Sequence, residues 1–382
     1  MVIPTPPAVH PRLALLREYF VEDPDNEALL AELVNAALET GRPDIAIDTL
    51  AALPPELAGQ APAVHLRSMA LLASGRYVEA EEVLRRLAAD TVLPPGSQFN
   101  LAFALVRQGR HPEAIDMLQA LLATEGAPPG TLAWLLRAIR HVHGLPAALA
   151  AWEGAPVASR SPEACGVASL LYFDADQLPR ARDLARESLS QGGRSSEALA
   201  TEAGAAIIEA RAGDAIALLQ EALSRNATDG RLWTTLAAAH MRQKDLQSAT
   251  AAYENAVRFM PDHIGTWHGY AWCQIMAGAL DGAASSFQRA YDLDRNFGET
   301  HGGQAVVAAL QGRTSEASSA IERALRLDPA GLSARFAQAV LSGEAADRQS
   351  LLRLAHRVLG SRPAPFGGVM AQFIPAPPDD TP

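Results

Sequence analysis

Three consecutive blocks of the sequence share one pattern: residues 230–263 read GRLWTTLAAAHMRQKDLQSATAAYENAVRFMPDH, residues 264–297 read IGTWHGYAWCQIMAGALDGAASSFQRAYDLDRNF, and residues 298–331 read GETHGGQAVVAALQGRTSEASSAIERALRLDPAG. The blocks are equal in length, with alanine at the eighth, twentieth and twenty-seventh positions and a bulky apolar residue at the twenty-fourth. This period is typical of two helices joined by a turn, a unit that buries its apolar faces only against stacked neighbours. Alanine suits positions where helices approach closely, because a larger side chain would overpack them. We therefore predict an all-α chain of repeated helix pairs.

The pattern resembles the tetratricopeptide repeat (TPR) family. Trp233 and Trp267 stand at the fourth position of their blocks, and Pro261 and Pro329 follow the second helix, where proline ends it. The resemblance implies an all-α TPR superhelix, which is a solenoid of helix–turn–helix repeats.

The same register extends over most of the chain. Gly41, Gly75 and Gly109 recur at the interval of the three blocks, where a tight turn between two helices needs the backbone freedom of glycine. The fourth unit is irregular and one residue short, so we expect a local change of superhelical pitch or a hinge there. The predicted organisation is a disordered N-terminus (1–10), an N-terminal capping helix (11–26), repeats 1–4 (27–161), repeats 5–9 (162–331), C-terminal capping helices (332–360) and a disordered proline-rich tail (361–382).

The tail contains one apolar island, residues 366–374, which reads FGGVMAQFI. Three hypotheses remain open for it. It is a short motif that a partner reads, a segment that folds back into the groove as an autoinhibitor, or a passive remnant.

Composition narrows the classes of partner and compartment. The net charge of −11 disfavours general binding to nucleic acid or to an anionic membrane. No apolar run approaches the length of a membrane span, and the N-terminal residues lack the cationic and apolar regions of a signal peptide. Cys165 and Cys273 lie three repeats apart, too far to bridge, which favours a reducing compartment. A single lysine beside 31 arginines suggests a GC-rich genome. We expect a bacterial, cytoplasmic protein without direct membrane insertion.

The resemblance also implies where a partner binds. In this family the first helices of successive repeats line a concave groove, and their second, fifth, ninth, and twelfth or thirteenth positions point into it. That geometry gives Asn35, His65, Met69, Phe99, Phe103, Arg107, Leu136, Ile139, Arg140, Tyr172, Met241, Arg242, His268 and Trp272 as groove residues. Their mixture of apolar groups and cations suits a protein or peptide segment with apolar anchors and one acidic group. The alternative is that several of them pack against neighbouring repeats.

Other aromatic residues occupy core positions of the repeat pattern. We predict a structural role for Trp134, Trp233, Tyr253, Trp267 and Phe287.

Signals of catalysis are absent from the sequence. It has no phosphate-binding glycine loop, no HExxH and no Gly-x-Ser-x-Gly. His141 and His143 are two residues apart, a spacing that does not place both on one helical face. We therefore predict no catalytic residues, no cofactor and no metal site, and favour a non-catalytic scaffold or adaptor. Two alternatives stay open, namely a substrate-recruiting subunit of a separate enzyme and a self-associating structural protein.

Overall fold

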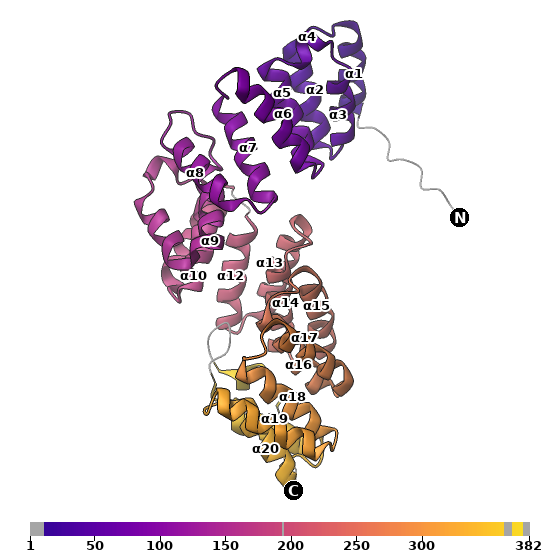
Figure 1. The fold of residues 1–382 in the computed structure, drawn as a ribbon, viewed down its shortest axis with the longest axis vertical. Helices are drawn as coiled ribbons and strands as arrows, with labels where there is room; N and C mark the ends of the chain where they lie inside the picture. Colours follow the sequence, from indigo (N-terminus) through magenta and orange to yellow (C-terminus); the bar gives the residue numbers. More distant parts are fainter. Residues whose placement is uncertain (1–10, 193–194, 363–368, 377–382) are drawn as a thin grey trace, which may run out of the picture. The chain divides into compact units, whose positions relative to one another are not determined.

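The computed structural model describes residues 11–192, 195–362 and 369–376. Of the residues that the structure describes, 78% are helical, and successive helices alternate as antiparallel pairs joined by short turns (Figure 1). The predicted all-α array of helix pairs is confirmed. Two compact units divide it, residues 1–175 (unit 1) and 176–382 (unit 2).

Unit 1 begins with a single helix and continues with helix pairs. Its helices are α1 (Pro11–Glu22), α2 (Glu27–Glu39), α3 (Pro43–Ala51), α4 (Pro55–Ala58), α5 (Ala61–Ala73), α6 (Tyr77–Asp90), α7 (Pro95–Arg107), α8 (His111–Leu122), α9 (Thr131–Gly154), η1 (Val157–Ser159) and α10 (Pro162–Asp174).

Unit 2 contains the three most regular repeats and the C-terminal helices. Its helices are α11 (Leu178–Ser190), α12 (Ser196–Ile208), α13 (Ala212–Arg225), α14 (Gly230–Arg242), α15 (Leu246–Phe259), α16 (Ile264–Ala277), α17 (Leu280–Leu293), α18 (Gly298–Leu310), α19 (Thr314–Leu327), α20 (Leu332–Ala339), η2 (Val340–Glu344), α21 (Arg348–Leu359) and η3 (Met370–Gln372).

The turn inside each repeat has a left-handed residue at a fixed place. Gly41, Gly75 and Gly109 have φ of 68°, 73° and 78°. The residue after each of them donates its N–H to the carbonyl five residues earlier, as Arg76 does to Leu71 at 2.9 Å. This bond caps the first helix in the Schellman manner and directs the chain into the second helix.

The fourth repeat departs from the others, as its irregular sequence suggested. Its two helices form one element, α9, in which Gly144 is non-helical (φ 81°, ψ −176°) and Pro146 follows. The change of pitch or hinge expected here stays a prediction.

The core of unit 2 depends on small residues at matching positions. Ala237, Ala271 and Ala305, at the eighth position, are completely buried. Gly303 lies under the ring of Phe287, and a Cβ on this glycine would stand 2.2 Å from Phe287 Cε1. The sixth position of these repeats therefore admits no side chain where an aromatic ring covers it.

The C-terminal region packs against the last repeats of unit 2. Helix α21 spans Arg348–Leu359, and Leu354 and Leu359 are buried on it. The described tail residues 369–376 differ from the expected disorder, since Phe373 and Ile374 are only 5% and 3% exposed. The expected disorder at residues 1–10, and in the tail at 363–368 and 377–382, falls outside the described residues.

Substitution of Gly303 by alanine tests the close packing against Phe287. We expect Gly303→Ala to lower the free energy of unfolding by about 1–3 kcal/mol, because the ring and the backbone have to move apart. Gly154→Ala is the control, since no atom lies within 4 Å of an added Cβ there. Urea denaturation followed by circular dichroism measures both. Equal effects of the two substitutions would contradict the packing described.

Candidate functional site

Unit 1 presents a row of aromatic side chains from three successive repeats. Phe99 and Phe103 are four residues apart on α7, so both lie on one face of that helix. The ring of Phe103 packs edge-on against Trp134 of α9 at 4.6 Å and against Tyr77 of α6 at 6.4 Å between centroids. All four side chains are partly exposed. We call Tyr77, Phe99, Phe103 and Trp134 the aromatic surface.

Two arginines stand at the edges of the aromatic surface. The guanidinium of Arg107 lies 5.1 Å from the centre of the Tyr77 ring, and that of Arg137 lies 4.5 Å from the centre of the Trp134 ring. Arg137 is paired with Glu163 at 2.8 Å. Arg107 is exposed and has no ion pair among the residues that the structure describes. The surface therefore combines apolar area with one available positive charge.

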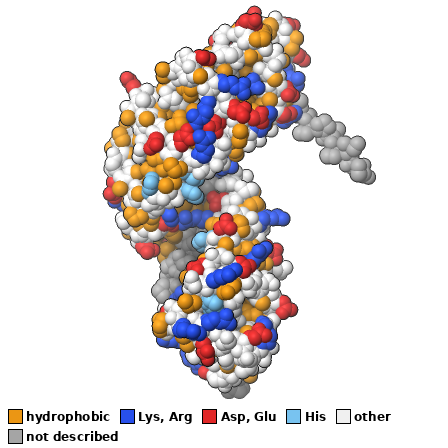
Figure 2. Space-filling view, in the orientation of Figure 1, with side chains coloured by type: hydrophobic (Ala, Val, Ile, Leu, Met, Phe, Trp, Pro, Cys, Tyr) orange, Lys and Arg blue, Asp and Glu red, His pale blue; other side chains and the backbone are white. Residues whose placement is uncertain are grey.

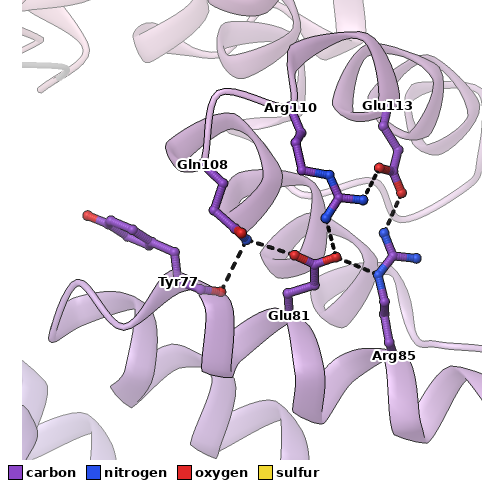
Figure 3. Close-up of polar contacts among 6 residues, drawn as sticks. All are labelled: Tyr77, Glu81, Arg85, Gln108, Arg110 and Glu113. Atoms are coloured by element: carbon purple, nitrogen blue, oxygen red, sulfur yellow. Dashed lines mark hydrogen bonds and ion pairs between the residues drawn. The ribbon is translucent and has the colours of Figure 1, made fainter.

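A buried acid links the elements that carry this surface. Glu81 of α6, which is 8% exposed, accepts hydrogen bonds from Arg85 (2.6 Å), Gln108 (2.8 Å) and Arg110 (2.6 Å), as Figure 3 shows. Glu113 also accepts hydrogen bonds from Arg85 and Arg110. The network joins α6 to the turn between α7 and α8, which belongs to the next repeat.

The network also fixes the start of α6. Gln108 Nε2 lies 3.4 Å from the carbonyl oxygen of Tyr77, whose side chain belongs to the aromatic surface. Desolvation opposes the ionisation of Glu81, but the hydrogen bonds from Arg85, Gln108 and Arg110 outweigh it and hold the pKa of Glu81 below its ordinary value. The carboxylate is therefore charged at neutral pH.

The other predicted groove residues of unit 1 differ in how accessible their side chains are to a partner. Asn35 is exposed, whereas Met69 packs against the core of the first repeats. His65 shares a hydrogen bond of 3.1 Å with Ser97 of the next repeat, and burial lowers its pKa. Arg140 lies 3.5 Å from Asp174.

Three more predicted groove residues of unit 1 are in the core. Leu136 and Ile139 are buried, as is Tyr172, whose hydroxyl donates to Glu153 at 2.9 Å. For these three the packing alternative describes the structure, because their repeats turn them inward.

The predicted groove residues of unit 2 mostly contact the protein itself. Met241 is buried, and the guanidinium of Arg242 lies 5.4 Å from the centre of the Phe373 ring. Trp272 packs edge-on against Phe336 of α20 at 5.7 Å. His268 shares a hydrogen bond of 2.8 Å with Thr300, and burial lowers its pKa to about 4, so its ring is neutral at pH 7.

The sequence interpretation missed part of the aromatic surface. Trp134 was assigned to the core, but it is partly exposed beside Phe103. Trp233 and Trp267 are also partly exposed, and each indole N–H donates to a carbonyl of the preceding loop, Ala227 at 2.8 Å and Pro261 at 2.7 Å. Tyr253 and Phe287 are buried as predicted. Arg137 follows Trp134 by three residues and so lies on the same side of the helix. That spacing was the signal that could have predicted a partly exposed Trp134.

Charged side chains of both signs lie interspersed on the face that Figure 2 draws. Within the described residues, no three histidine, cysteine or acidic side chains come together as a metal site would need. None of the described helices has the length and apolar composition of a membrane span.

Family comparison finds the same repeat in both units. One family model, described as tetratricopeptide repeat, matches residues 13–70, and a second with the same description matches residues 65–131 and 209–264. A search of curated proteins finds no match.

Solved structures give similar folds at low sequence identity. The human IFIT1 dimer with m7Gppp-AAAA is 16% identical, with a TM-score of 0.53, and the match covers 90% of each chain. YrrB, described as a TPR protein with an unusual peptide-binding site, is 18% identical over 44% of this chain and 88% of its own, with a TM-score of 0.39. MamA is 15% identical over 41% and 92%, with a TM-score of 0.38. At 16% identity the likeness to IFIT1 shows the fold alone.

Removal of the Glu81 carboxylate tests the network. We expect Glu81→Ala to lower the free energy of unfolding by about 2–4 kcal/mol at pH 7, because it leaves the groups around it without their acceptor. Glu82→Ala is the control on the same helix, since Glu82 and Arg86 form an exposed pair at 3.5 Å worth roughly 0–1 kcal/mol. Urea denaturation measures both variants.

The same variant predicts a pH dependence. The pKa of Glu81 is lower in the folded chain, so its stabilising effect is present above the unfolded pKa of roughly 4.3 and is lost as pH falls through the folded value. The difference between wild type and Glu81→Ala should therefore shrink below about pH 4. A difference that stays constant from pH 7 to pH 3 would contradict this assignment.

Proposed function

We propose that this chain, which is a tetratricopeptide repeat protein, is a non-catalytic adaptor that binds a peptide or protein segment on the aromatic surface of unit 1. Tetratricopeptide repeats are a fold of protein–protein interaction scaffolds, which use the extended surface that the stacked repeats create. The observation that carries the proposal is the contact of Phe103 with both Tyr77 and Trp134, all partly exposed, across three repeats.

Rigid aromatic groups are suited to this role. Tyrosine and tryptophan provide large contact areas at low entropic cost, and they are enriched among the residues that dominate binding energy. The row is held in place on both sides, since the Glu81 network fixes the start of α6 at Tyr77 and the Glu163 pair holds Arg137 against Trp134. A ligand would therefore meet a preorganised surface.

The chemistry of the ligand follows from the charges around the row. Apolar or aromatic side chains of a peptide would pack on Phe99 and Phe103, and an acidic group beside them would pair with Arg107, which is exposed and has no acidic partner in the described residues. We propose the bacterial cytoplasm as its compartment, which the two buried cysteines without a disulfide support. The proposal includes no cofactor and no nucleic-acid ligand.

A peptide library tests the proposal directly. Random twelve-residue peptides are selected on the immobilised full chain, and the affinity of the enriched peptide is measured by fluorescence anisotropy. We expect an enriched motif with apolar anchors and an acidic residue, and we expect Phe103→Glu to weaken its binding by roughly a hundredfold because it places a charge in the apolar row.

The controls separate this surface from others. Val78→Glu changes an exposed residue next to Tyr77 and should leave the affinity within about twofold. Trp272→Glu makes the corresponding change in unit 2 and should also leave the affinity within about twofold. Circular dichroism verifies that each variant is folded. If the selection yields no motif, or if Phe103→Glu binds as wild type does, the proposed function is wrong. If a labelled oligoadenylate bound with comparable affinity, the ligand of the aromatic surface would be nucleic acid instead of a peptide.

A further inference from the structure

A short C-terminal segment of the chain lies against the repeats of unit 2. After α21 ends at Leu359, the amide of Met370 donates to the carbonyl of Arg362 at 2.9 Å, and the amide of Ala371 donates to that of Gly360 at 3.0 Å. These two bonds turn the chain back on the end of α21. Residues 369–376, drawn in yellow in Figure 1, form what we call the C-terminal segment.

Two adjacent apolar side chains anchor the segment. Phe373 is 5% exposed and Ile374 is 3% exposed. Ile374 belongs to the same apolar cluster as Ala271 and Ile275 of α16, and Trp272 packs against that cluster. The segment therefore packs on an apolar area next to Trp272, which is one of the predicted groove residues.

Main-chain carbonyls of the segment are bound as well. The ammonium of Lys244 donates to the carbonyl of Gln372 at 2.6 Å and to that of Ile374 at 2.5 Å. His356 Nε2 lies 3.0 Å from the carbonyl oxygen of Pro375. These contacts recognise main-chain groups of the segment, whereas Arg242, which lies over the Phe373 ring, contacts a side chain. Together they form a receptor with apolar and polar parts.

Lys244 is an unusual residue for its position. It is the only lysine in the sequence, and it stands at the turn between α14 and α15 with φ of 64°. The same turn carries Gly41, Gly75 and Gly278 in other repeats, and a side chain there strains the backbone. Desolvation, with a smaller effect from Arg242, lowers the pKa of Lys244 to about 8. The lysine thus contributes a contact that the turn itself does not need.

The segment also forms one wall of an open pocket. Gln372 bounds a cavity of about 430 Å³ whose other walls are the turn at residues 210–214 and the side chains of Arg242 and Gln243. The pocket therefore lies between the C-terminal segment and the turn of the preceding repeat.

We propose that residues 369–376 occupy a peptide-binding site of unit 2 in cis, and that the ligand of this site in trans is a peptide with an aromatic and a β-branched residue side by side followed by proline. The C-terminal segment is then an internal competitor, and the trans ligand binds when the segment leaves. The site is separate from the aromatic surface of unit 1, so either proposal can fail while the other holds.

The test uses the peptide VMAQFIPA, which is residues 369–376, with a fluorescent label and full-length chains. Phe373→Ser combined with Ile374→Ser removes the anchors of the segment and leaves the receptor intact. We expect this double variant to bind the peptide at least roughly tenfold more tightly than wild type, because its own segment no longer competes. Adding Lys244→Gly should reverse the gain by roughly tenfold or more, since the two carbonyl contacts are lost.

Other outcomes and controls decide the alternatives. Lys244→Gly places at the turn the residue that most repeats carry, so it does not endanger the fold. In that single variant hydrogen exchange of residues 369–376 should be faster than in wild type, which gives a readout even if the double variant misfolds. Equal peptide binding by wild type and double variant, or unchanged exchange, would overturn the proposal. A wild-type dimer that the double variant converts to monomer would assign the segment to a second copy instead.

Discussion

Close approach of helices at small residues is the constraint on which this structure depends. Ala237, Ala271 and Ala305 are completely buried at one repeat position, and Gly303 leaves room for the ring of Phe287 from the preceding repeat. Each helix pair buries its apolar face against its neighbours, so the core of each unit lies between successive pairs and the first helices keep one face outside it. The candidate sites are consequences of that arrangement.

The two units use this face differently, although they repeat one pattern. Phe103 and Trp272 both stand at the ninth position of their repeats, and both are aromatic. Phe103 lies in the partly exposed row with Tyr77 and Trp134, whereas Trp272 packs against Phe336 of the C-terminal helices. In unit 2 the C-terminal helices and the segment after them cover what an internal repeat would leave open. Equivalent positions therefore have different surroundings in the two units.

Charge has a positioning role in unit 1. Glu81 is buried, and burial of a carboxylate is costly unless its partners are in place. Here Arg85 and Arg110 supply two charged donors and Gln108 a neutral one, and two of these three partners come from the next repeat. Such a network adds direction to a core that otherwise consists of non-directional apolar contacts, and it holds the aromatic surface on a fixed frame.

The sequence alone determined the repeat. A constant period, alanines at the close contacts and glycines at Gly41, Gly75 and Gly109 suffice to predict helix pairs and their turns, because these features act within one repeat or between neighbours. It also placed Phe99, Phe103 and Arg107 on one face of α7, since spacings of four residues along a helix define a face.

Only the tertiary structure decided which predicted groove residues are accessible. Tyr172 is buried, Trp134 is partly exposed beside Phe103, and Arg242 lies over Phe373, which is far from it in the sequence. A local pattern carries no information on such contacts, because they depend on how the irregular fourth repeat is turned and on where the chain returns after α21. The contact of Lys244 with the C-terminal segment is of this kind, and it exists only once the repeats have stacked.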